Sequence, residues 1–291
     1  MKFPLASLLL FLSVLLPTGS SLPWGYRSHE EIHRRAIKAL PPDARSFFEH
    51  HALELIERST EADKRRFADK SESRTHYINV DRYGKYPFSD LPHSYEDAIA
   101  KFGKDSVDAG GTVPWRIAEF TRGLTEAFMR NDTSGIIFYA ANLGHYVADA
   151  HVPLHATVNY DGQLSGQHGV HARWESRLPE KYLPSYDLEI RPARLITDPL
   201  EHAFGIVLNS FQKVDSVLAA DKKALESLPI NQRFVERKSK GKVVYEYRKE
   251  YYERFHGFLN GMVERQLENA IQEVASYWYT AWVNAKKTDK W

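Results

Sequence analysis

The chain has 291 residues and contains no cysteine, so no disulfide can stabilise it. It also has little net charge, because 39 Lys and Arg oppose 38 Asp and Glu and leave a formal charge of +1. A nearly neutral protein has no general attraction for a polyanion, so a nucleic-acid partner would need a local basic site. Nor does the sequence contain a fixed-period repeat. Its length and its 43% hydrophobic content are sufficient for a substantial buried core.

Long apolar runs are missing except near the N-terminus. There, Lys2 precedes an apolar run at 4–16, and small residues follow at 18–21. This order is typical of a secretory signal peptide, and a run of about a dozen residues is short for a membrane span. We expect residues 1–22 to be a signal peptide, with a retained anchor as the alternative. Residues 23–291 would then form one secreted or periplasmic domain.

Alternating β-type patterns are scarce, and apolar residues recur at helical spacing through most of the chain. We therefore expect an all-α fold with a single multi-helix domain. Ser28 and Glu31 form a Ser-x-x-Glu pattern that predicts the cap of a first helix ending at Leu40. Further helices are expected at 43–58, 93–103, 113–130, 134–150, 199–226 and 245–286, and loops at 156–170 and 177–198. An aromatic stripe in the last helix predicts core packing.

Five of the thirteen histidines lie between positions 145 and 171. His145 and Asp149 are four residues apart, which places both side chains on one face of a helix. His155 follows the Pro-Leu that ends this helix, and His171 and Glu175 repeat the four-residue spacing. A lone buried histidine is usually a hydrogen-bonded core residue, but two such pairs around a third histidine predict a metal site. Imidazole and carboxylate without thiolate suit zinc, with manganese and iron as alternatives.

The stretch HYVADAHVPLH at 145–155 resembles the core motif of a known superfamily, which contains the bacterial zinc-dependent phospholipases C and the single-strand-specific zinc nucleases. The resemblance extends over residues 24–176. It implies a helical protein with three zinc ions in a cleft, of the phospholipase C/zinc nuclease type. It also implies hydrolysis of phosphodiester bonds by a metal-activated hydroxide.

The same resemblance implies the metal ligands. Trp24 and His29 match an N-terminal tryptophan and a histidine of the first helix, and His76 matches a His-aromatic segment. The preceding aspartate is better matched by Asp63 than by Asp69. One zinc would be held by Asp63, His76, His145 and Asp149, a second by Trp24, His29 and the bridging Asp149, and the third by His155, His171 and Glu175. Asp63 would also orient or deprotonate the nucleophile.

A free α-amino group on Trp24 requires cleavage after Pro23, which a signal peptidase disfavours. We expect cleavage after Ser21, followed by removal of the dipeptide 22–23 by a proline-specific dipeptidyl peptidase.

The substrate class receives mixed signals. The stretch GVHARWE at 169–175 and the short gap between His155 and His171 resemble the phospholipases, as does the lack of cysteine. Arg66, three residues after Asp63, instead matches a basic residue with which the nucleases bind phosphate. We therefore expect a phospholipase C-like enzyme first and a nuclease or nucleotidase second. A secreted zinc-binding protein without catalysis is the third alternative.

The partner would accordingly be a phospholipid head group or a single-stranded nucleic acid. A phospholipase would also contact the membrane surface transiently, and no obligate protein partner is indicated. Either substrate could use aromatic side chains near the site, although packing is their more usual role. The aromatic residues in question are Tyr77, Tyr83, Tyr86, Phe88 and Tyr160.

Two other patterns, Glu30-x-x-His33 and Glu253-x-x-His256, raise the alternative of a di-iron carboxylate bundle. That alternative needs two more inward glutamates and leaves the segment 145–175 unexplained. Four further histidines are expected at the surface or at helix ends, namely His50, His51, His151 and His168.

Overall fold

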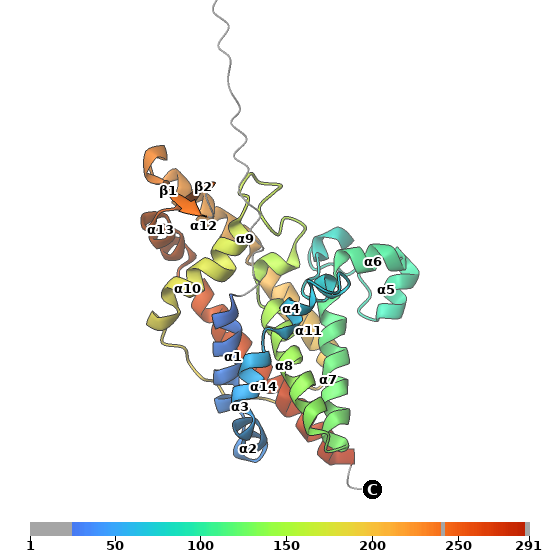
Figure 1. Ribbon diagram of the computed structural model, residues 1–291. Coiled ribbons are helices and arrows are strands. Elements are labelled where there is room, and N and C mark those ends of the chain that lie inside the picture. Colours follow the sequence, from blue (N-terminus) through green and yellow to red (C-terminus); the bar gives the residue numbers. More distant parts are fainter. Residues whose placement is uncertain (1–24, 240–241, 289–291) are drawn as a thin grey trace, which may run out of the picture.

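The computed structural model describes residues 25–239 and 242–288 (Figure 1). The expected signal peptide, its cleavage sites and Trp24 lie outside these residues. The α-helices are α1 (Tyr26–Ala39), α2 (Pro42–His50), α3 (Ala52–Arg58), α4 (Glu61–Arg65), α5 (Tyr95–Phe102), α6 (Lys104–Gly110), α7 (Val113–Met129), α8 (Thr133–Ala150), α9 (Val170–Ala172), α10 (Leu178–Tyr182), α11 (Pro199–Phe211), α12 (Val214–Glu226), α13 (Lys249–Leu259) and α14 (Met262–Thr288). Strands β1 (Phe234–Ser239) and β2 (Lys242–Tyr247) pair as an antiparallel hairpin. None of the described helices is both long and apolar enough to cross a membrane.

Helix α8 is the central element of the fold. Most of its residues are buried, and they lie on every face of the helix. Other helices must therefore cover it, and it packs against α7, α14, α3 and α1. The carboxylate of Asp132 caps its N-terminus by accepting a hydrogen bond of 3.0 Å from the backbone N–H of Gly135. Pro153 follows its C-terminus and excludes a further helical turn.

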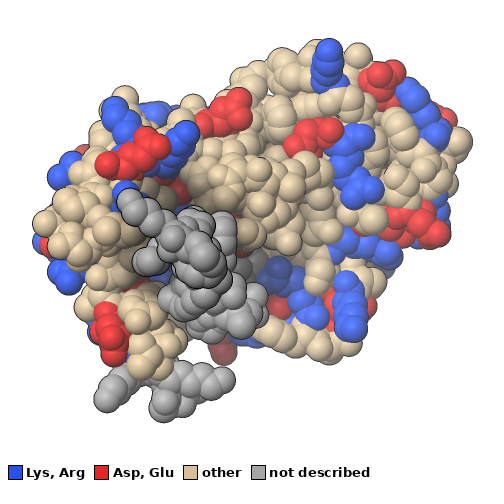
Figure 2. Space-filling model, turned by 90° about the horizontal axis from the view of Figure 1, so that it is seen from above, with Lys and Arg blue, Asp and Glu red and all other residues tan. Residues whose placement is uncertain are grey.

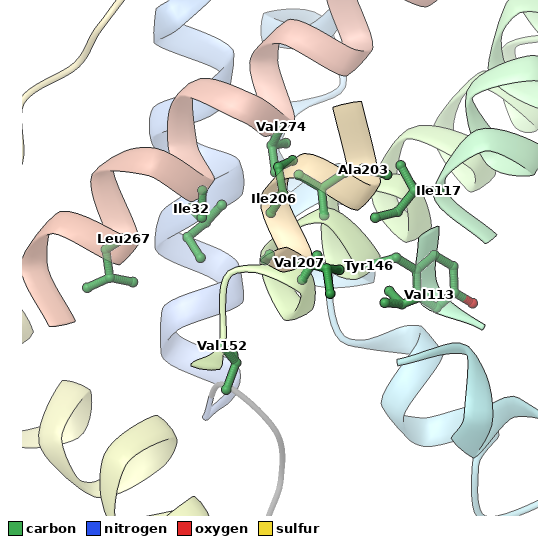
Figure 3. Close-up of a cluster of buried hydrophobic side chains, with 14 of the residues drawn as sticks. Ile32, Val113, Ile117, Tyr146, Val152, Ala203, Ile206, Val207, Leu267 and Val274 are labelled. Carbon is green, nitrogen blue, oxygen red and sulfur yellow. The ribbon is translucent and has the colours of Figure 1, made fainter. Parts of the chain in front are cut away.

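Part of the main core brings together α1, α7, α8, α11 and α14, which come from the start, the middle and the end of the chain (Figure 3). Each contributes buried apolar side chains, such as Ile32 of α1, Ile117 of α7, Tyr146 of α8, Ile206 of α11 and Val274 of α14. Both α1 and α14 pack along α8. Nε2 of His29 is 3.5 Å from Oδ1 of Asp149, so the first turn of α1 lies beside the last turn of α8. The candidate site lies at this end of the bundle.

The all-α prediction is confirmed, but three predicted helices are interrupted. The helix expected at 43–58 breaks at His51, and the one expected at 199–226 breaks between α11 and α12. The last breaks at Asn260 and Gly261, whose φ values of 48° and 74° end α13. The start of the segment 245–286 belongs to strand β2, where Tyr245 and Tyr247 flank Glu246 and two valines precede them, and β-branched and aromatic residues favour a strand.

Two further expectations about local structure are wrong. Helix α1 begins at Tyr26 rather than Ser28, so Ser28 is a buried residue inside the helix, and its hydroxyl makes no hydrogen bond to any described residue. Glu31 does not complete a capping box but forms ion pairs with Arg34 and Arg35. The segment 177–198, predicted as a loop, begins with helix α10.

Most of the large aromatic residues near the C-terminus pack in the core, as predicted. Tyr251, Phe255, Tyr277 and Trp278 are fully buried, which confirms their role in the core, whereas Tyr245 on the hairpin is 51% exposed. Seen from above, acidic and basic side chains are interspersed over the visible face (Figure 2), in keeping with the small net charge.

Candidate metal centre

Imidazole and carboxylate side chains from four separate segments meet at the C-terminal end of α8. Helix α1 contributes His29, α4 contributes Asp63, and a short 3-10 helix (Glu72–Thr75) is followed by His76. His145 and Asp149 both come from α8. All five residues are at most 1% exposed. The bundle therefore buries a group of polar residues that no apolar core would require.

Asp149 lies in the middle of this group. One of its oxygens, Oδ2, is 2.7 Å from Nδ1 of His76 and 3.2 Å from Nε2 of His145. The other, Oδ1, is 3.5 Å from Nε2 of His29. Nε2 of His145 is also 3.7 Å from Oδ1 of Asp63. Two overlapping sets of possible metal ligands result, one formed by His29, His145 and Asp149 and the other by Asp63, His76 and His145.

A third set lies beyond the end of α8. His155 belongs to a 3-10 turn (Pro153–Ala156), His171 to α9, and Glu175 to a π-helical turn (Arg173–Arg177) that continues α9. Nε2 of His155 is 3.2 Å from Nε2 of His171 and 3.7 Å from Oε2 of Glu175, and His171 and Glu175 form a close ion pair. The predicted short helix with both ligands on one face is confirmed.

The donor atoms fit metal ions of the expected kind. Ring nitrogens face each other at 3.1 Å between His76 and His145 and at 3.2 Å between His155 and His171. Two ligands of one tetrahedral zinc, each about 2.0–2.1 Å from it, are about 3.3 Å apart. In addition, neither ring nitrogen of His29 nor Oδ2 of Asp63 makes a hydrogen bond to a described residue, although both side chains are buried. Buried polar atoms without partners are costly, and a bound cation would satisfy a lone pair of His29 and one of Asp63.

Backbone carbonyls orient two of the imidazoles toward the site. Nδ1 of His145 donates a hydrogen bond of 2.8 Å to the carbonyl of Ser59, and Nδ1 of His171 donates one of 3.1 Å to the carbonyl of Tyr160. Because a carbonyl can only accept, the proton of each neutral ring lies on Nδ1. Nε2 of each ring then has its lone pair free for a metal.

The side chains near Asp149 have strongly shifted pKa values. Burial, and after it the charge of His145, lower the pKa of His29 to about 3, although Asp149 acts in the opposite direction. For His145, burial acts in the same direction, but the carboxylates of Asp149 and Asp63 outweigh it and raise the pKa to about 9. Burial raises the pKa of Asp63 to about 7, against the charges of His145 and Arg66. Such shifts are characteristic of functional sites.

Arg66 lies where the sets of ligands come together. Nη2 of Arg66 is 3.0 Å from Oδ1 of Asp63, and its side chain is one quarter exposed. Its positive charge acts on groups from both sides of the site, including His76 and Glu175. Asp69, the alternative to Asp63, is exposed and accepts hydrogen bonds from Ser71 instead.

Other histidines and aromatic residues considered in the sequence differ in their exposure. His151 is 4% exposed, so its expected surface position is wrong, whereas His168 and His50 are exposed as predicted. Tyr83 and Phe88 are buried in the core, while Tyr86 and Tyr160 are about half exposed.

The di-iron alternative lacks structural support. No possible metal-binding group among the described residues contains Glu30, His33, Glu253 or His256. His33 instead contacts backbone carbonyls of His29 and Ala141.

The sequence analysis did not identify the residues beside Nε2 of His76. Oε1 of Glu72 lies 3.8 Å from Nε2 of His76 and accepts hydrogen bonds from Tyr146 and Arg65. Burial raises the pKa of Glu72, but these donors outweigh it and hold the pKa below its usual value. The spacing Glu72-x3-His76 is the same as that of the two ligand pairs and was the available signal.

Comparison with known proteins agrees with this geometry. The family model of the S1/P1 nucleases matches residues 24–271. In fold, the chain is similar to the alpha-toxin of an avian strain of Clostridium perfringens, with a TM-score of 0.54 and 13% identity over 89% of this chain and 64% of the toxin. It is equally similar to the alpha-toxin of Clostridium absonum, with a TM-score of 0.54 and 14% identity over 90% and 64% of the two chains.

The chain thus spans 64% of the length of both toxins. No curated protein matches it significantly. At such low identity the toxins establish a common fold, which confirms the architecture expected from the motif at 145–155. The family match establishes more, because it covers most of the chain, including every described residue of the three candidate ligand sets. The protein belongs to the S1/P1 nuclease family.

Proposed function

We propose that the protein is a zinc-dependent phosphodiester hydrolase of the nuclease type, acting on single-stranded nucleic acid. The observation that carries the proposal is the meeting of three sets of histidines and carboxylates beside one partly exposed arginine, Arg66. Membership of the S1/P1 nuclease family, a family of zinc phosphodiesterases, supports it and favours nucleic acid over lipid as the substrate.

The residues of the site have distinct tasks in this proposal. Zinc ions, when bound, lower the pKa of nearby water and neutralise the charge of a phosphodiester. Asp63, His76, His145 and Asp149 would hold one ion, His29 and Asp149 with Trp24 a second, and His155, His171 and Glu175 the third. The guanidinium fork of Arg66, which is partly exposed beside Asp63, would bind a phosphate oxygen. Oδ2 of Asp63, which has no hydrogen-bond partner among the described residues, would orient the attacking water and accept its proton.

Tyr160 supports a substrate with bases. Its ring is 51% exposed and lies 6.2 Å from the ring of His171, centroid to centroid. An exposed aromatic face beside a phosphate site can stack a base of a single strand, whereas the bases of a duplex are already stacked on each other.

Phospholipid is the second candidate substrate. The pattern at 169–175, with Glu175 rather than aspartate, resembles the phospholipases. Phe67 next to Arg66 is 71% exposed and Leu164 in the loop before α9 is 70% exposed. Exposed apolar side chains of this kind also suit contact with a membrane surface.

A side-by-side assay separates the candidates. The zinc-loaded protein would be offered single-stranded DNA, duplex DNA and phosphatidylcholine vesicles, each with and without a chelator. We expect cleavage of single-stranded DNA that the chelator abolishes, and little cleavage of the other two. Preferential release of the phosphocholine head group would establish the phospholipase instead. Full zinc loading without turnover of any phosphodiester would leave only the zinc-binding role.

We also propose that the protein is exported and that the mature chain begins at Trp24. The family match begins at this residue, which supports the proposal. N-terminal sequencing of the exported protein tests it. A chain that begins at Ser21 or Leu22 and still carries its full zinc content would overturn it.

A further inference from the structure

Arg173 lies between the two ligand candidates of α9 and its π-helical continuation, His171 and Glu175. In a helix, residues i and i+4 share a face and residue i+2 points away from it. The side chain of Arg173 accordingly leaves the metal centre and enters the C-terminal half of the protein, where the residue is only 4% exposed. A charged group buried to this extent requires partners.

The main partner is Asp221 of α12, which is fully buried. Nε and Nη2 of Arg173 donate hydrogen bonds of 3.1 and 2.9 Å to Oδ1 of Asp221. The hydroxyl of Tyr251 on α13 contacts both residues, and the ring of Tyr247 on β2 lies 4.7 Å from the guanidinium carbon. One arginine thus joins the ligand-bearing segment to α12, α13 and the hairpin.

The same guanidinium holds the chain that leads into the ligand segment. Nη1 donates a hydrogen bond of 2.7 Å to the carbonyl of His168, and Nη2 donates one of 3.2 Å to the carbonyl of Gln167. The side-chain amide of Gln167 in turn donates 2.7 Å to Oδ2 of Asp221. His171 is therefore tied to the network on both sides, at residues 167–168 and at Arg173.

The ligand segment has little rigidity of its own. Helix α9 has three residues, it follows Gly169 in the left-handed conformation (φ 81°), and it continues as a π-helical turn. So short a helix is unstable alone, and π-helical turns are rare and frequently found at functional sites. Its orientation must come from tertiary contacts.

We propose that Arg173 and Asp221 are positioning residues for the third metal, and that this metal binds tightly only when α12 and α13 pack against the segment 167–177. Neither residue touches the metal. Their network sets the direction in which His171 and Glu175 face His155. The inference rests on the proposed zinc centre.

Zinc stoichiometry tests the inference in the mature, zinc-loaded protein. Asp221→Asn keeps the shape of the side chain but removes its charge. The matched control is Glu273→Gln, because Glu273 is also a buried carboxylate, with Arg194 and His202 as ion-pair partners. Zinc per protein would be measured after dialysis against graded chelator, together with the absorption spectrum of the cobalt-substituted protein, which reports ligand geometry.

We expect wild type and Glu273→Gln to retain three zinc ions and Asp221→Asn to bind the third about 10–100-fold more weakly. Three ions held equally tightly by Asp221→Asn would overturn the inference, and so would equal loss from both variants. If Asp221→Asn fails to fold, Tyr251→Phe removes one hydroxyl from the network, and it should weaken the third ion alone. A wild-type protein that never binds a third ion would instead contradict the proposed function, and the inference with it.

Discussion

The imidazole rings of His29 and His145 are stacked, with centroids 4.0 Å apart and ring planes 14° from parallel. The contact joins the first turn of α1 to the last turns of α8 at a point where both side chains are fully buried. Two protonated imidazoles this close would repel each other, and their pKa values move in opposite directions, to about 3 for His29 and about 9 for His145. The carboxylate of Asp149, within 3.5 Å of both rings, is the charge that makes this arrangement tolerable.

Asp149→Asn should therefore release the two zinc ions that Asp149 is proposed to hold. The amide keeps the size of the side chain but loses the charge that His29, His76 and His145 share. We expect kcat/KM to fall by more than about 100-fold, because even indirect contacts to metal ligands cost 10–100-fold. Zinc analysis and kinetics measure the effect. Asp108→Asn, which removes a carboxylate paired with Arg74 and Lys104, should keep its zinc.

Asp63→Asn and Asp69→Asn should separate the two candidates for the first aspartate. Asp63 is buried in a ligand set, so its substitution should abolish activity and release zinc. Asp69 is exposed, and its carboxylate accepts hydrogen bonds only from Ser71 in the described part of the chain, so its substitution should leave kcat/KM within about twofold. Comparable loss of zinc from both variants would contradict the geometry.

Arg66→Ala should weaken substrate binding without releasing zinc. Arg66 contacts Asp63 but belongs to none of the three ligand sets. A charge-assisted hydrogen bond contributes about 1.5–3 kcal/mol, so we expect kcat/KM to fall about 10–100-fold. Lys64→Ala, in the same basic run but exposed, serves as the control. If kcat/KM of Arg66→Ala equals that of the wild type, Arg66 does not bind the phosphate of the substrate.

Gly144→Ala should destabilise the protein despite the better helix propensity of alanine. A Cβ at this position would lie 2.4 Å from Nε2 of His33. His33 cannot move aside easily, because its ring contacts the carbonyls of His29 and Ala141. Overpacking costs about 1–3 kcal/mol and outweighs a propensity gain of about 1 kcal/mol.

Gly205→Ala is the matched control for this substitution. In α11, no atom lies within 4 Å of the corresponding Cβ position, so alanine should stabilise the protein slightly. Urea denaturation measures both free energies of unfolding. Equal changes in the free energy of unfolding of the two variants would show that the ring of His33 moves aside.

Stability should decrease in acid partly through Glu273. Burial raises its pKa, but the hydrogen bond and charge of His202 outweigh burial and hold the pKa below the usual 4.5. The folded state therefore binds fewer protons at this group than the unfolded state, and its stabilising contribution is present above about pH 4.5 and lost below it. Glu273→Gln should lower the free energy of unfolding at pH 7 and flatten its decline below pH 4.5. Urea titrations with chelator in every sample keep zinc release out of the comparison.

Much of the fold and site could be predicted because the relevant signals are local. The apolar spacing of 134–150 predicts α8, and the spacing of His145 and Asp149 places both on one face of it before any contact is known. The same holds for His171 and Glu175. The hairpin at 234–247 was missed, because neighbouring aromatic residues fit a helical stripe as well as a strand.

The sequence by itself determined the all-α class and which site residues of α8 and of the α9 segment share a face, since both depend on spacing along the chain. Only the tertiary structure decided that Asp63 rather than Asp69 reaches His145 and that Arg173 is anchored by Asp221, 48 residues away. Such contacts depend on the packing of several helices at once, because each buried charge needs a partner that only the folded chain can bring to it.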